Sequence, residues 1–197
     1  MDKVFVIGRD SVPAYTSLGE GESLRWTIVV LPGTSCDLCF EIDADAPGCE
    51  VDLAGLYLCN SDEKVRIKVL LKHNSGQCSS RQLFKGIVGG QASTLFDGLI
   101  YVAPDAQRTK ALQENHSILL SQGARAESRP QLEIYADDVE CSHGATTGFL
   151  DADEQFYMRS RGIPEDEARH LQMIAFLAPV ASRLPEEIAE EVYDSIS

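Results

Sequence analysis

The alternation of apolar and polar positions indicates a chain built mainly of β-strands. From Ser23 to Thr146, short runs of Val, Ile, Leu and Phe are separated by Gly, Asp, Asn and Ser. Runs of this length and composition are typical of strands, and helical spacing is almost absent between them. The predicted strands are Leu24–Leu31, Leu38–Ile42, Val51–Cys59, Val65–His73, Leu83–Val88, Leu95–Val102, Ser117–Ser121, Leu132–Tyr135 and Val139–His143.

Two neighbouring runs repeat one pattern and favour a parallel solenoid. Leu83–Val88 reads Leu-Phe-Lys-Gly-Ile-Val, and Leu95–Ile100 reads Leu-Phe-Asp-Gly-Leu-Ile. We interpret these runs as stacked rungs of a parallel β-helix, with Gly86 and Gly98 at tight corners. A β-sandwich also contains many short strands, but the sequence has no Asn-Gly hairpin dipeptide, which weakens the case for antiparallel pairing.

The periodicity changes after Thr147 to one typical of helices. Asp151 followed by Glu154 resembles a helix N-cap, and Gly162 marks the end of that helix. Pro164 suits the first position of a second helix, because its missing N–H has no partner to lose there.

A third predicted helix begins at Pro185 and carries an apolar stripe. Ile188, Val192 and Ile196 recur every four residues beside several glutamates. Such a stripe either packs inward or contacts a partner protein, and we favour inward packing.

These patterns divide the chain into two units. We predict a parallel β-helix core over residues 1–149 and a small C-terminal α-helical domain over residues 150–197. A chain of 197 residues that is 44% hydrophobic is long enough to bury such a core.

The net charge argues against two classes of partner. The chain has 17 Lys and Arg against 31 Asp and Glu, a net charge of −14. This excess repels the phosphates of nucleic acids and the anionic surface of a membrane. The first apolar run, Val4–Ile7, stops at Gly8 and is too short for a signal peptide or a spanning helix. We therefore expect a cytoplasmic protein with reduced cysteines.

The acidic pairs have a plain structural interpretation. Asp43 with Asp45, and Asp137 with Asp138, could hold a cation, but solvated loop acids are the favoured interpretation. The sequence contains no phosphate-binding loop, dinucleotide fingerprint, nucleophile elbow or zinc-protease motif. Nucleotide and protease chemistry therefore have no support in the sequence.

Two pairs of possible metal ligands differ in geometry. Cys36 and Cys39 form a lone Cys-x-x-Cys, and residues three apart on a strand point to opposite faces, which favours structural cysteines. Cys141 and His143 lie two residues apart in the last predicted strand, so alternation places both on one face. A thiolate beside an imidazole suits iron, an iron-sulfur cluster or zinc, but two ligands do not complete a site. Incidental packing and a site completed by a partner chain both stay open from these residues.

The segment from Pro130 to Thr146 resembles the core signature of the SufB/SufD family of iron-sulfur cluster assembly proteins. It reads Pro-Gln-Leu-Glu-Ile-Tyr-Ala-Asp-Asp-Val-Glu-Cys-Ser-His-Gly-Ala-Thr, and similar stretches extend from His73 to Ala181. Within the family, Cys-Ser-His-Gly-Ala-Thr is similar to SufD members, whereas SufB members carry an acidic residue before the histidine. Family members are longer, so we expect this chain to correspond to their C-terminal part.

The resemblance implies a right-handed parallel β-helix followed by a C-terminal helical domain, in a scaffold subunit that is not an enzyme. In the family, SufB and SufD pair through their β-helices, and the SufC ATPase docks on each C-terminal domain. A transient iron-sulfur cluster forms at the SufB-SufD interface. Cys141 and His143 match the family's motif positions and are therefore candidate metal ligands shared across that interface. No cofactor is expected in the isolated chain.

Two other hypotheses fit the same patterns. A solenoid with surface acids also suits a carbohydrate-active enzyme. A purely structural homodimer, in which Cys141 and His143 are merely packed, is the third.

Overall fold

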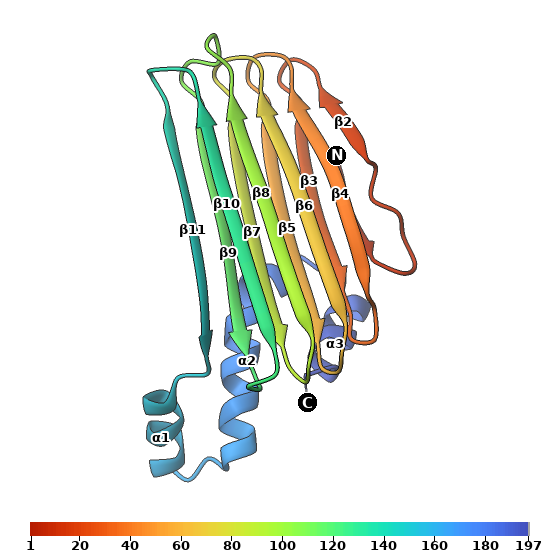
Figure 1. Cartoon of the computed structure of the whole chain (residues 1–197), viewed down its shortest axis with the longest axis vertical. Helices are drawn as coiled ribbons and strands as arrows, with labels where there is room; N and C mark the ends of the chain where they lie inside the picture. Colours follow the sequence, from red (N-terminus) through yellow and green to blue (C-terminus); the bar gives the residue numbers. More distant parts are fainter. Residues whose placement is uncertain (197) are drawn as a thin grey trace.

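The structure, a computed structural model, describes residues 1–196 and is built around two parallel β-sheets that face one another (Figure 1). Successive strands alternate between the two sheets, so each coil of the chain contributes one strand to each. The space between the sheets holds the main hydrophobic core, which includes Trp26, Phe40, Phe84 and Phe96. This arrangement confirms the predicted fold class, a parallel β-solenoid followed by short helices.

The two sheets are named by the numbers of their strands. The odd sheet has six strands: β1 (Asp2–Val6), β3 (Ser23–Val30), β5 (Glu50–Cys59), β7 (Ser79–Val88), β9 (Lys110–Leu119) and β11 (Glu140–Phe149). The even sheet has five: β2 (Tyr15–Leu18), β4 (Cys36–Ala44), β6 (Lys64–His73), β8 (Ser93–Val102) and β10 (Arg125–Ile134). Strands of the two sheets run in opposite directions (Figure 1).

The predicted stacking of two neighbouring runs is wrong. Leu83–Val88 lies in β7 and Leu95–Ile100 in β8, and these strands belong to different sheets. The strands stacked on β7 are β5 and β9, so one rung comprises two strands. The two runs share a pattern because each sends a phenylalanine into the interior, where the Phe84 and Phe96 ring centroids are 4.8 Å apart.

The predicted role of the two glycines is also wrong, because both lie inside strands. A Cβ atom at Gly86 would lie 1.8 Å from the Tyr57 ring. One at Gly98 would lie 2.4 Å from Nε2 of Gln113. Each glycine therefore leaves room for a buried side chain from another strand.

The strands at the C-terminal end of the solenoid are longer than predicted. Ser117–Ser121 and Leu132–Tyr135 overlap only the last parts of β9 and β10, and Val139–His143 overlaps only the first part of β11. The inward positions of β9 include buried Gln113 and Asn115. These polar residues interrupt the apolar alternation that marks a strand. The strands β1 and β2 were not predicted from the sequence.

Three helices follow the last strand: α1 (Ala152–Ser160), α2 (Glu165–Ala181) and α3 (Glu186–Asp194). Asp151 caps α1 as predicted, and its carboxylate accepts hydrogen bonds of 2.8 and 2.9 Å from two backbone N–H groups of the first turn. Gly162, with φ of +90°, follows α1. The helices α2 and α3 begin one residue after Pro164 and Pro185. Within residues 1–196, no helix has the length and apolar composition needed to cross a membrane.

The helix α2 covers part of the outer face of the odd sheet. A second hydrophobic cluster joins them, with members that include Leu56, Leu58, Ile87, Met173, Leu177 and Val180. Val192 of α3 is buried in this cluster, and Ile188 and Ile196 are partly buried against it. The stripe on α3 therefore packs inward, as favoured from the sequence. The division of the chain into domains at residues 149 and 150 stays a prediction.

Candidate functional site

The strand β11 is the last rung of the odd sheet and carries the predicted pair Cys141 and His143. It pairs with β9 and forms one edge of that sheet (Figure 1). Cys141 lies in register with Ala111, and His143 lies in register with Gln113. Ala111 and Gln113 are both buried in the interior. Because parallel strands stack in register, both members of the pair continue the inward row of side chains.

The two side chains differ in exposure. Cys141 is partly buried and packs against the main core, whereas His143 is exposed. Burial raises the pKa of the Cys141 thiol, and a backbone hydrogen bond at Ala111 opposes this shift to a smaller extent. Burial therefore favours the protonated form of this thiol. The imidazole of His143 is the more accessible of the two possible metal ligands.

These donors do not form a complete metal site. Among residues 1–196, no group of three or more His, Cys, Asp and Glu side chains is arranged to hold a metal ion. Iron-sulfur clusters and zinc usually take four protein donors per site or cluster. A cluster at Cys141 and His143 would therefore need donors from another surface.

Beneath this pair lies a polar stretch of the solenoid interior that was not predicted from the sequence. Gln113 is fully buried and donates from Nε2 to Oε1 of Gln82 at 3.1 Å. The hydroxyl of Tyr57 donates to Oδ1 of Asn115 at 2.9 Å and shares a hydrogen bond of 2.8 Å with Oγ of Ser117. Burial raises the pKa of Tyr57 to about 12. Polar residues at every second position of β9 were the available signal in the sequence.

The Cys-x-x-Cys pair does not form a chelate. Cys36 packs against the core from the inner face of β4, and burial raises the pKa of its thiol to about 11. Cys39 is exposed. The predicted placement on opposite faces is therefore confirmed.

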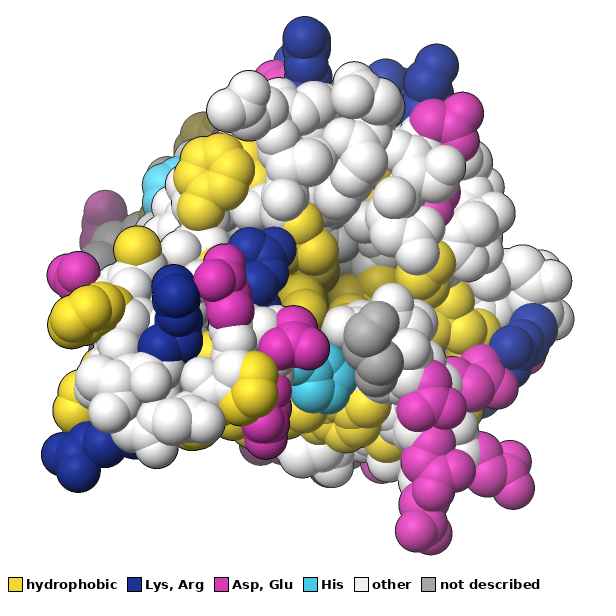
Figure 2. All heavy atoms as spheres, turned by 90° about the horizontal axis from the view of Figure 1, so that it is seen from below, with side chains coloured by type: hydrophobic (Ala, Val, Ile, Leu, Met, Phe, Trp, Pro, Cys, Tyr) yellow, Lys and Arg dark blue, Asp and Glu magenta, His cyan; other side chains and the backbone are white. Residues whose placement is uncertain are grey.

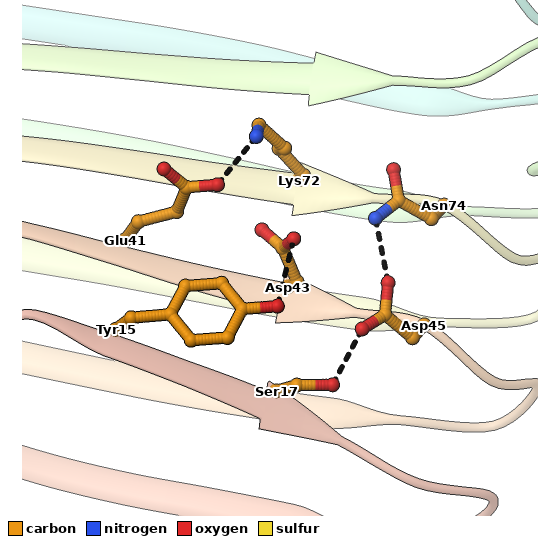
Figure 3. Close-up of polar contacts among 7 residues, drawn as sticks. All are labelled: Tyr15, Ser17, Glu41, Asp43, Asp45, Lys72 and Asn74. Atoms are coloured by element: carbon orange, nitrogen blue, oxygen red, sulfur yellow. Dashed lines mark hydrogen bonds and ion pairs between the residues drawn. The ribbon is translucent and has the colours of Figure 1, made fainter.

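Asp43 is ordered on a strand face, which corrects the expectation of a solvated loop acid, whereas Asp45 follows the strand and is exposed, as expected (Figure 3). Asp43 lies within β4, exposes 8% of its surface and accepts a hydrogen bond of 3.3 Å from the Tyr15 hydroxyl. Burial is the main reason that the pKa of Asp43 is raised. Asp45 accepts hydrogen bonds from Ser17 and Asn74, and these lower its pKa.

The second acidic pair, Asp137 and Asp138, matches the expectation of solvated loop acids. Asp137 and Asp138 lie between β10 and β11 and are exposed. Asp138 is 3.9 Å from Arg108 in an exposed ion pair, which contributes little to stability.

A groove of about 810 Å³ opens between α1, α2 and the ends of β9 and β11. Its walls include the apolar residues Ile118, Phe149, Leu150, Tyr157, Met158, Leu171, Ala175 and Phe176. Asp151, Asp153 and Glu154 supply an acidic rim. Phe149 and Tyr157 expose 66% and 60% of their surfaces. Figure 2 views the molecule from this end and shows hydrophobic side chains around a hollow.

The fold and this edge strand match a known protein family. The family model described as SUF system FeS cluster assembly, SufBD core domain, matches residues 13–176. The chain belongs to the SufB/SufD family. The match begins well upstream of His73, so the family resemblance extends over more of the solenoid than the sequence signature indicated.

The relatives support a SufD-like member of this family. The iron-sulfur cluster assembly protein SufD of Escherichia coli is 46% identical over 117 residues, which cover 59% of this chain and 28% of that protein. SufD of Bacillus subtilis is 38% identical over 113 residues, covering 57% and 26%. An iron-sulfur cluster assembly SufBD family protein of Mycobacterium leprae is 32% identical over 175 residues, covering 85% and 45%. The chain thus spans less than half the length of these curated relatives.

Proposed function

We propose that this SufD-like chain is a cytoplasmic, non-enzymatic scaffold subunit that supports iron-sulfur cluster assembly at an interface with a SufB-type partner. The observation that carries the proposal is the placement of Cys141 and His143 on the edge strand β11, as an incomplete set of donors. Its relatives are named iron-sulfur cluster assembly proteins, which supports an iron-sulfur cluster as the cargo.

The edge strand supplies the means of pairing. One side of β11 binds β9, and the other side offers backbone N–H and C=O groups to a further strand. A partner strand bound there brings its own side chains close to the inward row. The partner's thiolate and other donors then complete a cluster site with His143, and Cys141 joins when its proton is displaced.

The groove beside α1 is proposed as the docking site for the SufC ATPase. Its apolar walls are exposed and its rim is acidic, which suits a partner segment with apolar side chains flanked by Lys or Arg. ATP hydrolysis by SufC then moves the helical segment 150–197, which we propose as a domain distinct from residues 1–149. The chain itself contributes binding surfaces and no chemical step.

The interface role is tested by anaerobic reconstitution of the chain with SufB and SufC. We expect His143→Ala to lower the iron and sulfide retained by the complex by about tenfold or more, because a ligand is lost. The control is Ser142→Ala, which alters the outward face of the same strand and should retain both. Equal iron and sulfide in the His143→Ala complex would refute the ligand role.

The docking role is tested by capture of purified SufC. Tyr157→Ala removes a wall of the groove and should weaken SufC capture while SufB capture persists. Phe156→Ala is the matched control, because Phe156 is 74% exposed on the same helix and does not line the groove. If the chain captures neither protein and associates with itself, the structural homodimer replaces this proposal.

A further inference from the structure

One column of inward side chains connects the interior of the solenoid to His143. Gln82 of β7 lies in register with Gln113 of β9, and Gln113 lies in register with His143 of β11. Neighbouring strands of a sheet are about 4.8 Å apart, so these three residues lie above one another in one column. Gln113 is therefore placed between Gln82 and His143 in this column.

The Gln113 amide is satisfied on one side only. Its Nε2 donates to Oε1 of Gln82 at 3.1 Å. Its Oε1 is buried and has no hydrogen-bond partner among residues 1–196. Leaving a buried acceptor unpaired is unfavourable, so a hydrogen bond donated to this oxygen would stabilise the fold.

Gly98 restricts where the amide can point. A Cβ atom at Gly98 would lie 2.4 Å from Nε2 of Gln113 and 2.8 Å from its Oε1, so the amide fills the space above the β8 backbone. In a planar amide the C=O and C–N bonds diverge from one carbon, so the oxygen and nitrogen face different sides. Because Nε2 donates to Gln82 in the preceding rung, we infer that Oε1 faces the following rung, to which His143 belongs.

We propose that Gln113 is a positioning residue for His143. Oε1 of Gln113 accepts a hydrogen bond from Nδ1–H of the His143 imidazole. The lone pair of the imidazole Nε2 is then free to bind a metal. The described structure contains no hydrogen bond to His143, and the exposed ring reaches Oε1 by rotating its side chain toward the interior. Fixing the tautomer in this way is the usual task of the residue behind a histidine ligand.

This inference deepens the proposed function and rests on it for the use of the Nε2 lone pair. The hydrogen bond itself belongs to this chain alone. It is therefore testable on the isolated chain, without SufB, SufC or a cluster.

The experiment is long-range ¹H–¹⁵N NMR of the His143 ring in the ¹⁵N-labelled full chain at neutral pH. We expect the Nδ1–H tautomer to be enriched in the original chain. Gln113→Met has nearly the same shape but a weak acceptor, and should shift the tautomer ratio about fivefold toward Nε2–H. Ser117→Ala removes another polar group from the inward row of β9, and should leave the ratio unchanged.

A second variant protects the test against loss of folding. Gly98→Ala displaces the Gln113 amide without altering either member of the hydrogen bond, and should also shift the ratio. An unchanged ratio in a folded Gln113→Met or Gly98→Ala chain overturns the inference. If His143→Ala abolishes cluster assembly and Gln113→Met leaves the ratio unchanged, the proposed function stands and this inference fails. The opposite pair of results refutes the ligand role and keeps the hydrogen bond.

Discussion

The buried His73 makes the stability of the solenoid depend on pH. Its side chain is fully buried at the end of β6, and Nε2 forms a hydrogen bond of 2.9 Å with Oγ of Ser80. Nδ1 is buried without a hydrogen-bond partner among residues 1–196. Burial lowers the pKa of His73 from 6.5 to about 4, because the charged ring would lose its hydration.

The sign and size of the effect follow from these two values. The pKa in the folded state lies below that of the unfolded state, so protons bind the unfolded chain more readily. The contribution of His73 is therefore fully present above pH 6.5 and is lost as the pH falls toward 4. With these pKa values, the free energy of unfolding falls by about 2 kcal/mol between pH 7.5 and pH 5.

The assay compares denaturant unfolding of the original chain with His73→Gln at pH 7.5 and pH 5. Gln is neutral at both values and can still form a hydrogen bond with Ser80. Between pH 7.5 and pH 5, we expect the free energy of unfolding to fall by about 2 kcal/mol more in the original chain than in the variant. Ser80→Ala is the control, since it removes the hydrogen-bond partner and keeps the titrating ring, so its pH dependence should persist.

A parallel loss of stability in the original chain and in His73→Gln would refute this reasoning. In that case another group would carry the acid sensitivity, and His73 would not be a neutral buried histidine. If His73→Gln has a lower free energy of unfolding than the original chain already at pH 7.5, that difference reflects only how glutamine fits in the core.

Three further predictions concern packing, hydrogen bonding and capping. Gly86→Ala forces a Cβ into the Tyr57 ring and should cost about 1–3 kcal/mol of unfolding free energy, whereas Gly144→Ala meets no atom within 4 Å and should be tolerated. Tyr57→Phe removes the donor to Asn115 and should cost about 1–3 kcal/mol in the same denaturant assay. Asp151→Ala removes the cap of α1 and should cost about 0.5–2 kcal/mol of helix stability, seen as faster amide hydrogen exchange in its first turn. Unchanged exchange would contradict the capping role, and unchanged midpoints would contradict the other two.

The sequence predicted strands well where the interior is apolar and poorly where it is polar. The runs Val51–Cys59 and Val65–His73 match β5 and β6 almost completely. In β9 the inward positions Gln113 and Asn115 are polar, so the strand was recognised only from Ser117. Hydrophobic alternation reports what the core is made of, and a buried polar row gives no such signal.

The candidate site was predictable in part. Spacing alone placed Cys141 and His143 on one face, because strand alternation is a local property. The residue below His143 depends on the register between β9 and β11, which are separated by an entire coil. The groove beside α1 brings Ile118 and Phe176 together from distant segments, and no local pattern reports such a meeting.

The inward column that ends at His143 changes character along the solenoid. It begins with Lys3 on β1, passes through Trp26 and Leu53, continues with Gln82 and Gln113, and reaches the edge strand at His143. An apolar side chain at the uncovered end would extend the hydrophobic core into water, and such patches promote uncontrolled association. A polar column instead keeps the end hydrated when the chain is alone and supplies hydrogen-bonding groups when a partner covers it. The proposed interface requires a surface that exists in both states, and the change from tryptophan to histidine along one column meets that requirement.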